Sequence, residues 1–489
     1  MDKKSANGFF LRMLAIAVVL AMYGIIFSIW LHFSSLPVTY NPPPIKLPKS
    51  NAYDYYLAAS KAIVCKMQIT EALLNAPPCD PAIYRRAGTG MIGGPGAKGS
   101  MPPMPGMGGG MPGMGMGMGM PGMSGMTIAK LPPGVPQECT LTRPYNTKEK
   151  QAVLDANARA FELLEKAYNC KQCCIPYRSD NDTRHLNYEE IRPLLDLQYE
   201  LYLAEGKNWD AALVDLKQYK ASIDLLHNCG SSHYYTAMSS RRKVRRHLYQ
   251  LMGDLSSDQA MTLAGRLQQL LNDMPTATAI GASKEREELW NSASSLNERD
   301  WREQIGSNAR SDDFWNSGEF VIKCEELKTK LFGLAYSRRG YLAAMEEAYG
   351  QVDEELGKPF QSMSFAIPRI LNENLKSYIN GEYKGMIFTY TAQKALDDML
   401  ILSLLLKAYK TQHGKYPASL AQLSPNYIKS LPQDPFAKSG NYTYKKVNDN
   451  YTLYSVGPNS KDDNGNAIYG TGGILEKNIY GDIVAGASR

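Results

Sequence analysis

Residues 384–489 combine a long apolar helix pattern with two short aromatic strands, and this order constrains the fold more than any other feature. The run from Ala395 to Tyr409 has the apolar spacing of a helix. Tyr442 to Tyr444 and Tyr451 to Tyr454 follow it as β-type runs separated by polar turn residues. The unit is therefore expected to contain a helix followed by two short strands.

Three further segments of this unit stand in a specific order. They are His413-Gly414-Lys415-Tyr416-Pro417, then Leu431-Pro432-Gln433-Asp434-Pro435-Phe436, then Ser455-Val456-Gly457-Pro458-Asn459. Together with the strands, they resemble the globular domain of the major pseudopilin of type II secretion, pilin G. The resemblance covers about 384–484 of the 489 residues. It implies an extracytoplasmic α+β module, built from a long helix and a small antiparallel sheet and stabilised by a metal ion.

The loop that closes this unit is a candidate calcium site. Calcium takes six to eight oxygen ligands from carboxylates, amides and backbone carbonyls. Residues 462–466, Asp-Asp-Asn-Gly-Asn, supply such oxygens on a flexible backbone, and a later aspartate can return to the same place. The pseudopilin resemblance implies the carbonyl of Val456 and the side chains of Asn459, Asp462, Asp463 and Asp482 as ligands. The alternative is a polar turn that binds no metal.

The run from Met13 to Leu31 contains no charged residue and is about long enough to cross a bilayer as a helix. Lys3, Lys4 and Arg12 precede it, which favours a cytoplasmic N-terminus. We therefore expect a single-pass anchor in a bacterial inner membrane, with the bulk of the chain outside the cytoplasm. One alternative is a cleaved signal peptide, although no clear small-x-small cleavage site follows the run. Another is prepilin-type processing after Gly8.

The fold class expected for the whole chain is mainly α, and its length suggests several units. We expect a cytoplasmic N-terminus (1–12), the anchor (13–31), a proline-rich spacer (32–50) and a helical segment (51–87). These are followed by a Gly/Met/Pro-rich linker (88–126), an extracytoplasmic α-helical domain (127–383) and the pseudopilin-like domain (384–489).

Helix patterns run through the middle of the chain. Leu194 to Ala204 and Ala211 to Leu226 flank a short turn and predict an antiparallel helix pair. Ser256 and Gln259 have the spacing of a capping box ahead of another helix. The run Arg241 to Arg246 is the densest basic cluster, and within a helix pattern it favours a solvated helix face.

The cysteine count is even, which is compatible with disulfides in a chain expected outside the cytoplasm. Cys170 and Cys173 form a CxxC, but it follows the helix pattern Gln151 to Tyr168 at its C-terminal end. A redox CxxC is favoured at a helix N-terminus, and a zinc site needs a second ligand pair. We therefore expect structural bridging. The eight cysteines are Cys65, Cys79, Cys139, Cys170, Cys173, Cys174, Cys229 and Cys324.

Gly88 to Met126 consists almost entirely of Gly, Met and Pro and is typical of a linker without a packed core. The alternative is a Cu(I) site, because thioethers at this spacing are soft ligands. The methionines concerned are Met114, Met116, Met118, Met120, Met123 and Met126.

No motif of a known catalytic type is present in the sequence: it has no HExxH, no GxSxG and no Walker loop. The net charge of +6 is small for this length and does not favour nucleic acid as a partner. We therefore expect a non-enzymatic, membrane-anchored interaction or structural protein whose partners belong to a secretion or pilus-like apparatus. The alternatives are a genuine minor pseudopilin, a copper-handling envelope protein and an enzyme in the helical domain.

Overall fold

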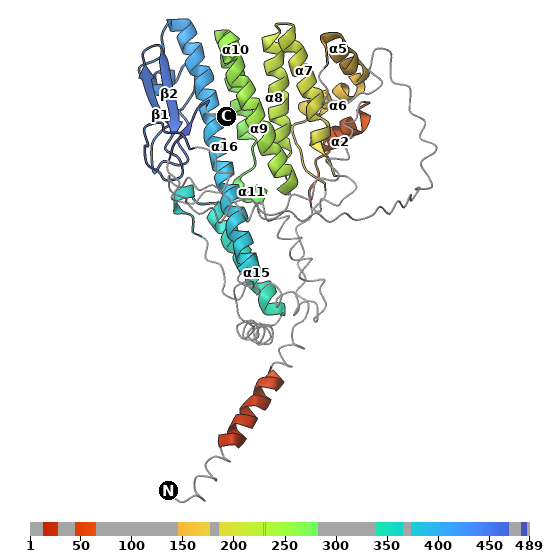
Figure 1. Ribbon diagram of the computed structural model, residues 1–489, viewed down its shortest axis with the longest axis vertical. Coiled ribbons are helices and arrows are strands. Elements are labelled where there is room, and N and C mark those ends of the chain that lie inside the picture. The colour runs from red at the N-terminus through yellow and green to blue at the C-terminus, as the bar shows by residue number, and fades with distance from the viewer. Residues whose placement is uncertain are drawn as a thin grey trace, which may run out of the picture.

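The computed structural model describes residues 13–27, 45–64, 145–176, 185–227, 229, 231–281, 338–364, 373–468 and 481–486. Over these residues the protein is mainly helical with one small antiparallel sheet, as the sequence predicted (Figure 1). The Gly/Met/Pro-rich tract, with its proposed Cu(I) ligands, and the processing position Gly8 lie outside the described residues.

The helical body is a row of packed helices. In Figure 1 α5, α7, α8, α10 and α16 stand side by side, and α15 lies below this row. The helices are α2 (Ala52–Ala62), α5 (Thr147–Ala156), α6 (Ala158–Asn169), α7 (Arg192–Ala204), α8 (Asn208–Asp224), α9 (Ser231–Leu251), α10 (Ser257–Asn272), α11 (Ala277–Gly281), α15 (Arg338–Leu356) and α16 (Glu373–His413). Short 3-10 turns lie at Tyr188–Glu190, Met252–Asp254, Phe360–Ser362 and Leu420–Leu423.

Local sequence patterns predicted several of these helices correctly. The predicted helix pair is α7 and α8, and the turn between them contains Gly206, whose φ of 70° favours glycine. The capping box is present at the start of α10, where Ser256 and Gln259 each bond the other's backbone N–H. Periodicity and capping are properties of neighbouring residues, so they can be read without knowing the tertiary structure.

The pattern from Gln151 to Tyr168 forms two helices, α5 and α6, with a break at Asn157. The Asn157 side chain is buried and donates to the carbonyl of Val153 (2.8 Å). Its oxygen accepts from the backbone N–H of Val64, just beyond α2 (2.8 Å). A buried amide that bonds the backbone of another segment explains why the helix is interrupted here.

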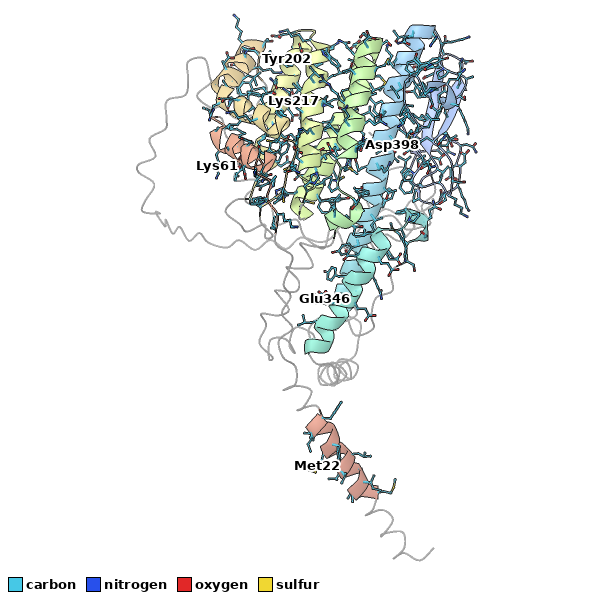
Figure 2. The ribbon with its side chains drawn as sticks, turned by 180° about the vertical axis from the view of Figure 1, so that it is seen from behind. Met22, Lys61, Tyr202, Lys217, Glu346 and Asp398 are labelled. Atoms are coloured by element: carbon cyan, nitrogen blue, oxygen red, sulfur yellow. The ribbon has the colours of Figure 1, made fainter. Side chains whose placement is uncertain are left out.

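The C-terminal unit consists of α16 and a three-stranded sheet in the order β1 (Thr443–Val447), β2 (Asn450–Ser455) and β3 (Ile483–Val484). β1 and β2 form a hairpin in which Thr443 lies opposite Tyr454. In Figure 1 the sheet lies on the side of α16 that faces away from α10. Asp398 of α16, labelled in Figure 2, accepts a hydrogen bond from the hydroxyl of Tyr442 just before β1 (2.9 Å).

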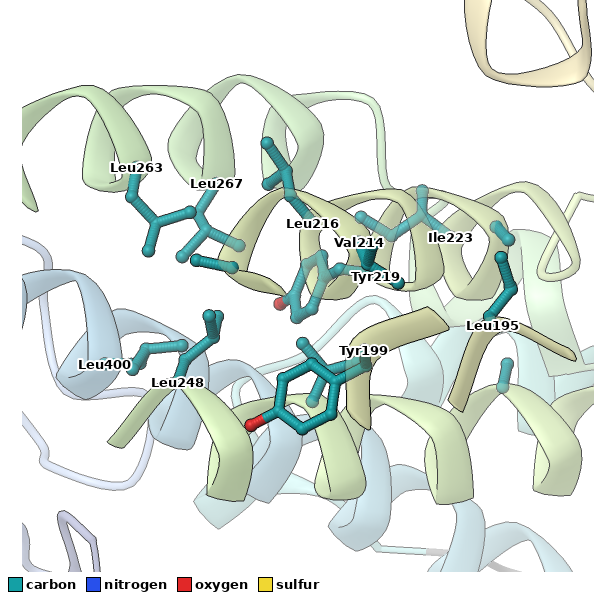
Figure 3. Close-up of a cluster of buried hydrophobic side chains, with 14 of the residues drawn as sticks. Leu195, Tyr199, Val214, Leu216, Tyr219, Ile223, Leu248, Leu263, Leu267 and Leu400 are labelled. Atoms are coloured by element: carbon teal, nitrogen blue, oxygen red, sulfur yellow. The ribbon is translucent and has the colours of Figure 1, made fainter. Parts of the chain in front are cut away.

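α16 crosses residue 384, where we predicted that the C-terminal domain begins. One continuous cluster of buried side chains includes residues of the helical body, of α16 and of the sheet. Figure 3 shows part of it, with Leu263 and Leu267 of α10 near Leu248 of α9 and Leu400 of α16. Because the two predicted domains share this core, each stabilises the other by covering its apolar surface.

The basic run does not form a solvated helix face, and that prediction was wrong. Arg241 and Arg245 of α9 are fully buried, each with an exposed fraction of 0%. Both bond the carboxylate of Asp397 on α16, Arg245 through Nη1 at 2.8 Å. Arg242 and Arg246 are exposed, as expected. Asp397 lies far along the chain from the basic run, so the run alone could not indicate this ion pair.

Residues 13–27 form a helix, which is part of the predicted anchor. Residues 28–31 of that segment lie outside the described residues. Each residue from 13 to 27 is exposed, and Figure 2 shows the side chains around Met22 pointing away from the helix. In the described part of the chain, no helix combines the length and the apolar character needed to cross a membrane.

Candidate functional site

The loop after β2 contains all five predicted calcium ligands, and the sheet determines how its two ends meet. β2 pairs with β3 so that Ser455 lies opposite Ile483. An isolated parallel bridge joins Ala467 to Asp482. These pairings bring Asp482 back beside residues 463–466, as the sequence analysis expected.

Asp482 is at the centre of this loop. Its exposed fraction is 0%, and its two oxygens accept from the backbone N–H groups of Asp463 (3.2 Å) and Gly465 (2.6 Å). Burial raises the pKa of the Asp482 carboxyl, and the charges of Asp462 and Asp463 raise it further, while the two N–H donors act in the opposite direction. The site therefore concentrates negative charge around a buried carboxylate.

Asp463 lies next to Asp482. Its Oδ2 accepts from the amide of Asn459 (2.7 Å) and from the backbone N–H of Gly481 (2.9 Å). The Asn459 oxygen accepts from the backbone N–H of Lys461 (3.1 Å). Asn459 and Asp463 thus connect the two ends of the loop, but the amide nitrogen rather than the oxygen of Asn459 contacts the carboxylate.

Asp462 has different neighbours from the other predicted ligands. It is exposed, and its Oδ1 accepts from the Tyr454 hydroxyl and from the backbone N–H of Asn464, both at 2.8 Å. The hydrogen bond from Tyr454 lowers the pKa of this carboxyl. Asp463 and Asp482 are therefore brought together, whereas Asp462 bonds the hairpin.

Val456 begins the loop and is followed by a required glycine. Gly457 has a φ of 67°, and a Cβ on it would lie 2.4 Å from the carbonyl oxygen of Gly481. A side chain at Gly457 would therefore separate the two ends of the loop. In the described part of the chain, no group of three or more His, Cys, Asp or Glu side chains is arranged to hold a metal ion.

Asp434 supports this loop and was not among the predicted site residues. Its exposed fraction is 4%. One oxygen accepts from the backbone N–H of Phe436 (2.9 Å) and the hydroxyl of Ser455 (2.7 Å), and the other accepts from the N–H of Val456 (3.0 Å). The signal that could have identified it is an Asp-Pro pair, which is typical of a side chain that bonds the backbone two residues later.

The thiols of Cys170, Cys173 and Cys174 are not in disulfides, so for these three cysteines the predicted structural bridging was wrong. Cys170 is the C-cap residue of α6, so the CxxC lies at a helix C-terminus, as expected. Burial raises the pKa of the Cys173 thiol well above its usual range, and burial also raises that of Cys174. Cys65, Cys79, Cys139 and Cys324 lie outside the described residues.

Comparison with known proteins gave no match to a family model, to a curated protein or to a solved structure. The resemblance to pilin G therefore stays a prediction.

Proposed function

We propose that this chain is a membrane-anchored interaction or structural protein of the bacterial cell envelope, with its helical body and C-terminal sheet outside the cytoplasm. The observation that carries the proposal is the exposed, uncharged helix over residues 13–27. Partners in a secretion or pilus-like apparatus are part of the same proposal and follow from the resemblance to pilin G.

The side chains of this helix support a membrane location. Its large apolar residues, from Met13 (53% exposed) to Phe27 (57%), are all more than half exposed. Elsewhere in the described chain, most side chains of this kind lie in the core. Exposed apolar surface on this scale is costly in water, and insertion into lipid removes the cost. Lys3, Lys4 and Arg12 favour a cytoplasmic N-terminus.

The anchor can be tested by fractionation and by topology reporters. We expect the full-length chain to remain in the membrane fraction after alkaline washing, and a reporter that functions only outside the cytoplasm to be active after Arg489. Leu20→Arg should release a large share of the protein, because a charge at the centre of a helix costs about 2.5–3.5 kcal/mol on insertion. Leu203→Arg, on α7, is the control and should stay bound. Activity of a cytoplasm-only reporter after Arg489 would contradict the proposal.

We also propose that the loop from Val456 to Asp482 binds calcium. Asp463 and Asp482 lie within one hydrogen-bonded loop, and their mutual repulsion favours a cation between them. Each carboxylate oxygen has two lone pairs, so an N–H donor leaves room for a metal bond. The Val456 carbonyl and the Asn459 side chain belong to the same loop and would add oxygen ligands.

Calcium should raise the melting temperature of the full-length protein in detergent. A ligand that binds only the folded form contributes about 2.7 kcal/mol at a hundredfold excess over its Kd. Asp463→Asn should remove the calcium-dependent shift, and Asp462→Asn should reduce it only in part, because Asp462 bonds Tyr454 instead. Asp449→Asn, on the exposed hairpin turn, should leave it unchanged. Equal melting in calcium and in chelator would show that the loop is a polar turn.

Two of the other functions predicted from the sequence depend on segments outside the described residues. A minor pseudopilin requires processing after Gly8, so a mature chain that begins at Phe9 would support that alternative. A copper-handling protein would use the tract Gly88 to Met126. Both stay predictions.

A further inference from the structure

A cavity of about 640 Å³ lies where the C-terminal ends of α6, α8 and α10 meet. Cys170, Cys173 and Cys174 all contribute to its wall. Three cysteines of one short segment thus line a space large enough for a small molecule.

The segment that carries these thiols is held in place by residues at the start of α2. Asn51 has an exposed fraction of 4%, and its side chain bonds both backbone groups of Cys174, the carbonyl at 2.8 Å and the N–H at 2.9 Å. The N–H of Ala52 donates to the carbonyl of Gln172 (3.0 Å). The backbone of the segment is therefore fixed by a second element, so the positions of the thiols are defined.

The three thiols differ in their surroundings. Cys173 is buried, and its pKa is raised first by burial and then by the charge of Asp224. Cys174 is half-buried, and burial raises its pKa as well. Both are therefore poor sources of thiolate at neutral pH. Cys170 is half-buried, and its Sγ lies 3.3 Å from the Ser50 hydroxyl, which can donate a hydrogen bond to a thiolate.

Lysines give the cavity a small excess of positive charge. Lys46, Lys171 and Lys220 line it, against the carboxylates of Asp224 and Asp273. Asp224 is already bonded by Lys220 (2.5 Å) and by the hydroxyl of Tyr56 (2.7 Å). Lys46 and Lys171 are exposed and line the cavity, and Lys171 directly follows Cys170 in the chain. Their ammonium groups can attract a ligand that carries carboxylates.

We propose that Cys170 forms a mixed disulfide with a small, carboxylate-bearing disulfide that enters this cavity. The Cys170 thiol loses its proton to solvent, and the thiolate attacks one sulfur of the bound disulfide. A new S–S bond forms to Cys170 while the original S–S bond breaks, and the released thiolate takes up a proton from solvent. The small disulfide is the only oxidant required.

The position of Cys170 determines the kind of reaction. Cys170 is the C-cap residue of α6, so its CxxC follows a helix, whereas a catalytic CxxC is favoured at a helix N-terminus. The exchange is therefore a stoichiometric modification of the protein and not a catalytic cycle. It needs neither the membrane anchor nor calcium, so its test is independent of the proposed function.

The test compares oxidised glutathione, which carries carboxylates, with cystamine, a disulfide that carries only amines. Reduced full-length protein in detergent is incubated with each at low salt, and adducts are located by peptide mass mapping. We expect the adduct on Cys170 to form before any on Cys173 or Cys174. Glutathione should react roughly two- to fivefold faster than cystamine, as expected for exposed charge pairs.

Two variants and a control separate the contribution of the lysines from that of Ser50. Lys46→Gln with Lys171→Gln should remove the preference for glutathione, whereas Lys61→Gln, at the exposed end of α2, should retain it. Ser50→Ala should slow both reagents by a similar factor. The proposal is overturned if Cys170 forms no adduct, if Cys173 or Cys174 reacts first, or if the preference survives in the double lysine variant.

Discussion

Replacing Asp397 with alanine is expected to destabilise the folded body by about 3–5 kcal/mol, since it leaves two fully buried guanidinium groups without their counter-ion. Arg241 and Arg245 both bond this carboxylate, and the exposed fraction of Asp397 is only 1%. Arginine does not deprotonate in proteins, so neither side chain can remove the cost by losing its charge. Urea unfolding followed by far-UV circular dichroism measures the loss.

Replacing Arg241, Arg245 and Asp397 together should lower the free energy of unfolding much less than replacing Asp397 alone. In the triple variant Arg241→Met, Arg245→Met and Asp397→Leu no buried charge is left over, and such replacements are often neutral or stabilising. Within the described residues, Arg245 has Nε and Nη2 atoms without a hydrogen-bond partner, so the native cluster is incompletely satisfied. Arg246→Met, at an exposed position of α9, is the control. A triple variant less stable than Asp397→Ala would contradict this explanation.

Replacing Asp434 with alanine is expected to destabilise the C-terminal unit by about 3 kcal/mol or more. The change removes the acceptor of three hydrogen bonds and leaves their donors near or within the core, at about 1–3 kcal/mol for each donor that stays buried. These donors are the backbone N–H groups of Phe436 and Val456 and the hydroxyl of Ser455. Hydrogen exchange of the hairpin amides, together with urea unfolding, measures the loss.

The variant Asp434→Asn should have a stability between those of wild type and Asp434→Ala. Asp434→Asn can keep the oxygen that accepts from Phe436 and Ser455, but its NH₂ group would face the N–H of Val456. Its cost should therefore be smaller than that of alanine but not zero. Asp449→Ala, at an exposed position of the hairpin turn, should change stability by less than about 0.5 kcal/mol. If Asp434→Ala unfolds at the same urea concentration as wild type, the carboxylate does not support the loop.

The sequence by itself determined the elements whose signals are local. The apolar spacing from Ala395 to Tyr409 lies within α16, and the two aromatic runs became β1 and β2 of a hairpin. The helix pair α7 and α8 and the capping box of α10 were also predicted from the sequence alone. Each of these signals depends on residues a few positions apart, so periodicity, turn chemistry and capping suffice to identify them.

The candidate calcium loop was predicted only in part. The concentration of Asp and Asn at residues 459–466 is visible in the sequence, and so is a later aspartate that can return to it. The burial of Asp482, the contact of Asp462 with Tyr454 and the support from Asp434 depend on how the strands pair. A pairing register cannot be read from a cluster of polar residues.

Only the tertiary structure decided the environments that depend on distant partners. Arg241 and Arg245 look like part of a solvated face until α16 places Asp397 against them. The three cysteines of residues 170–174 line one cavity, and Asn51, far earlier in the chain, bonds the backbone of Cys174. A buried charge is tolerated in a folded protein only when a partner of opposite charge is supplied, and here a helix more than a hundred residues away supplies it.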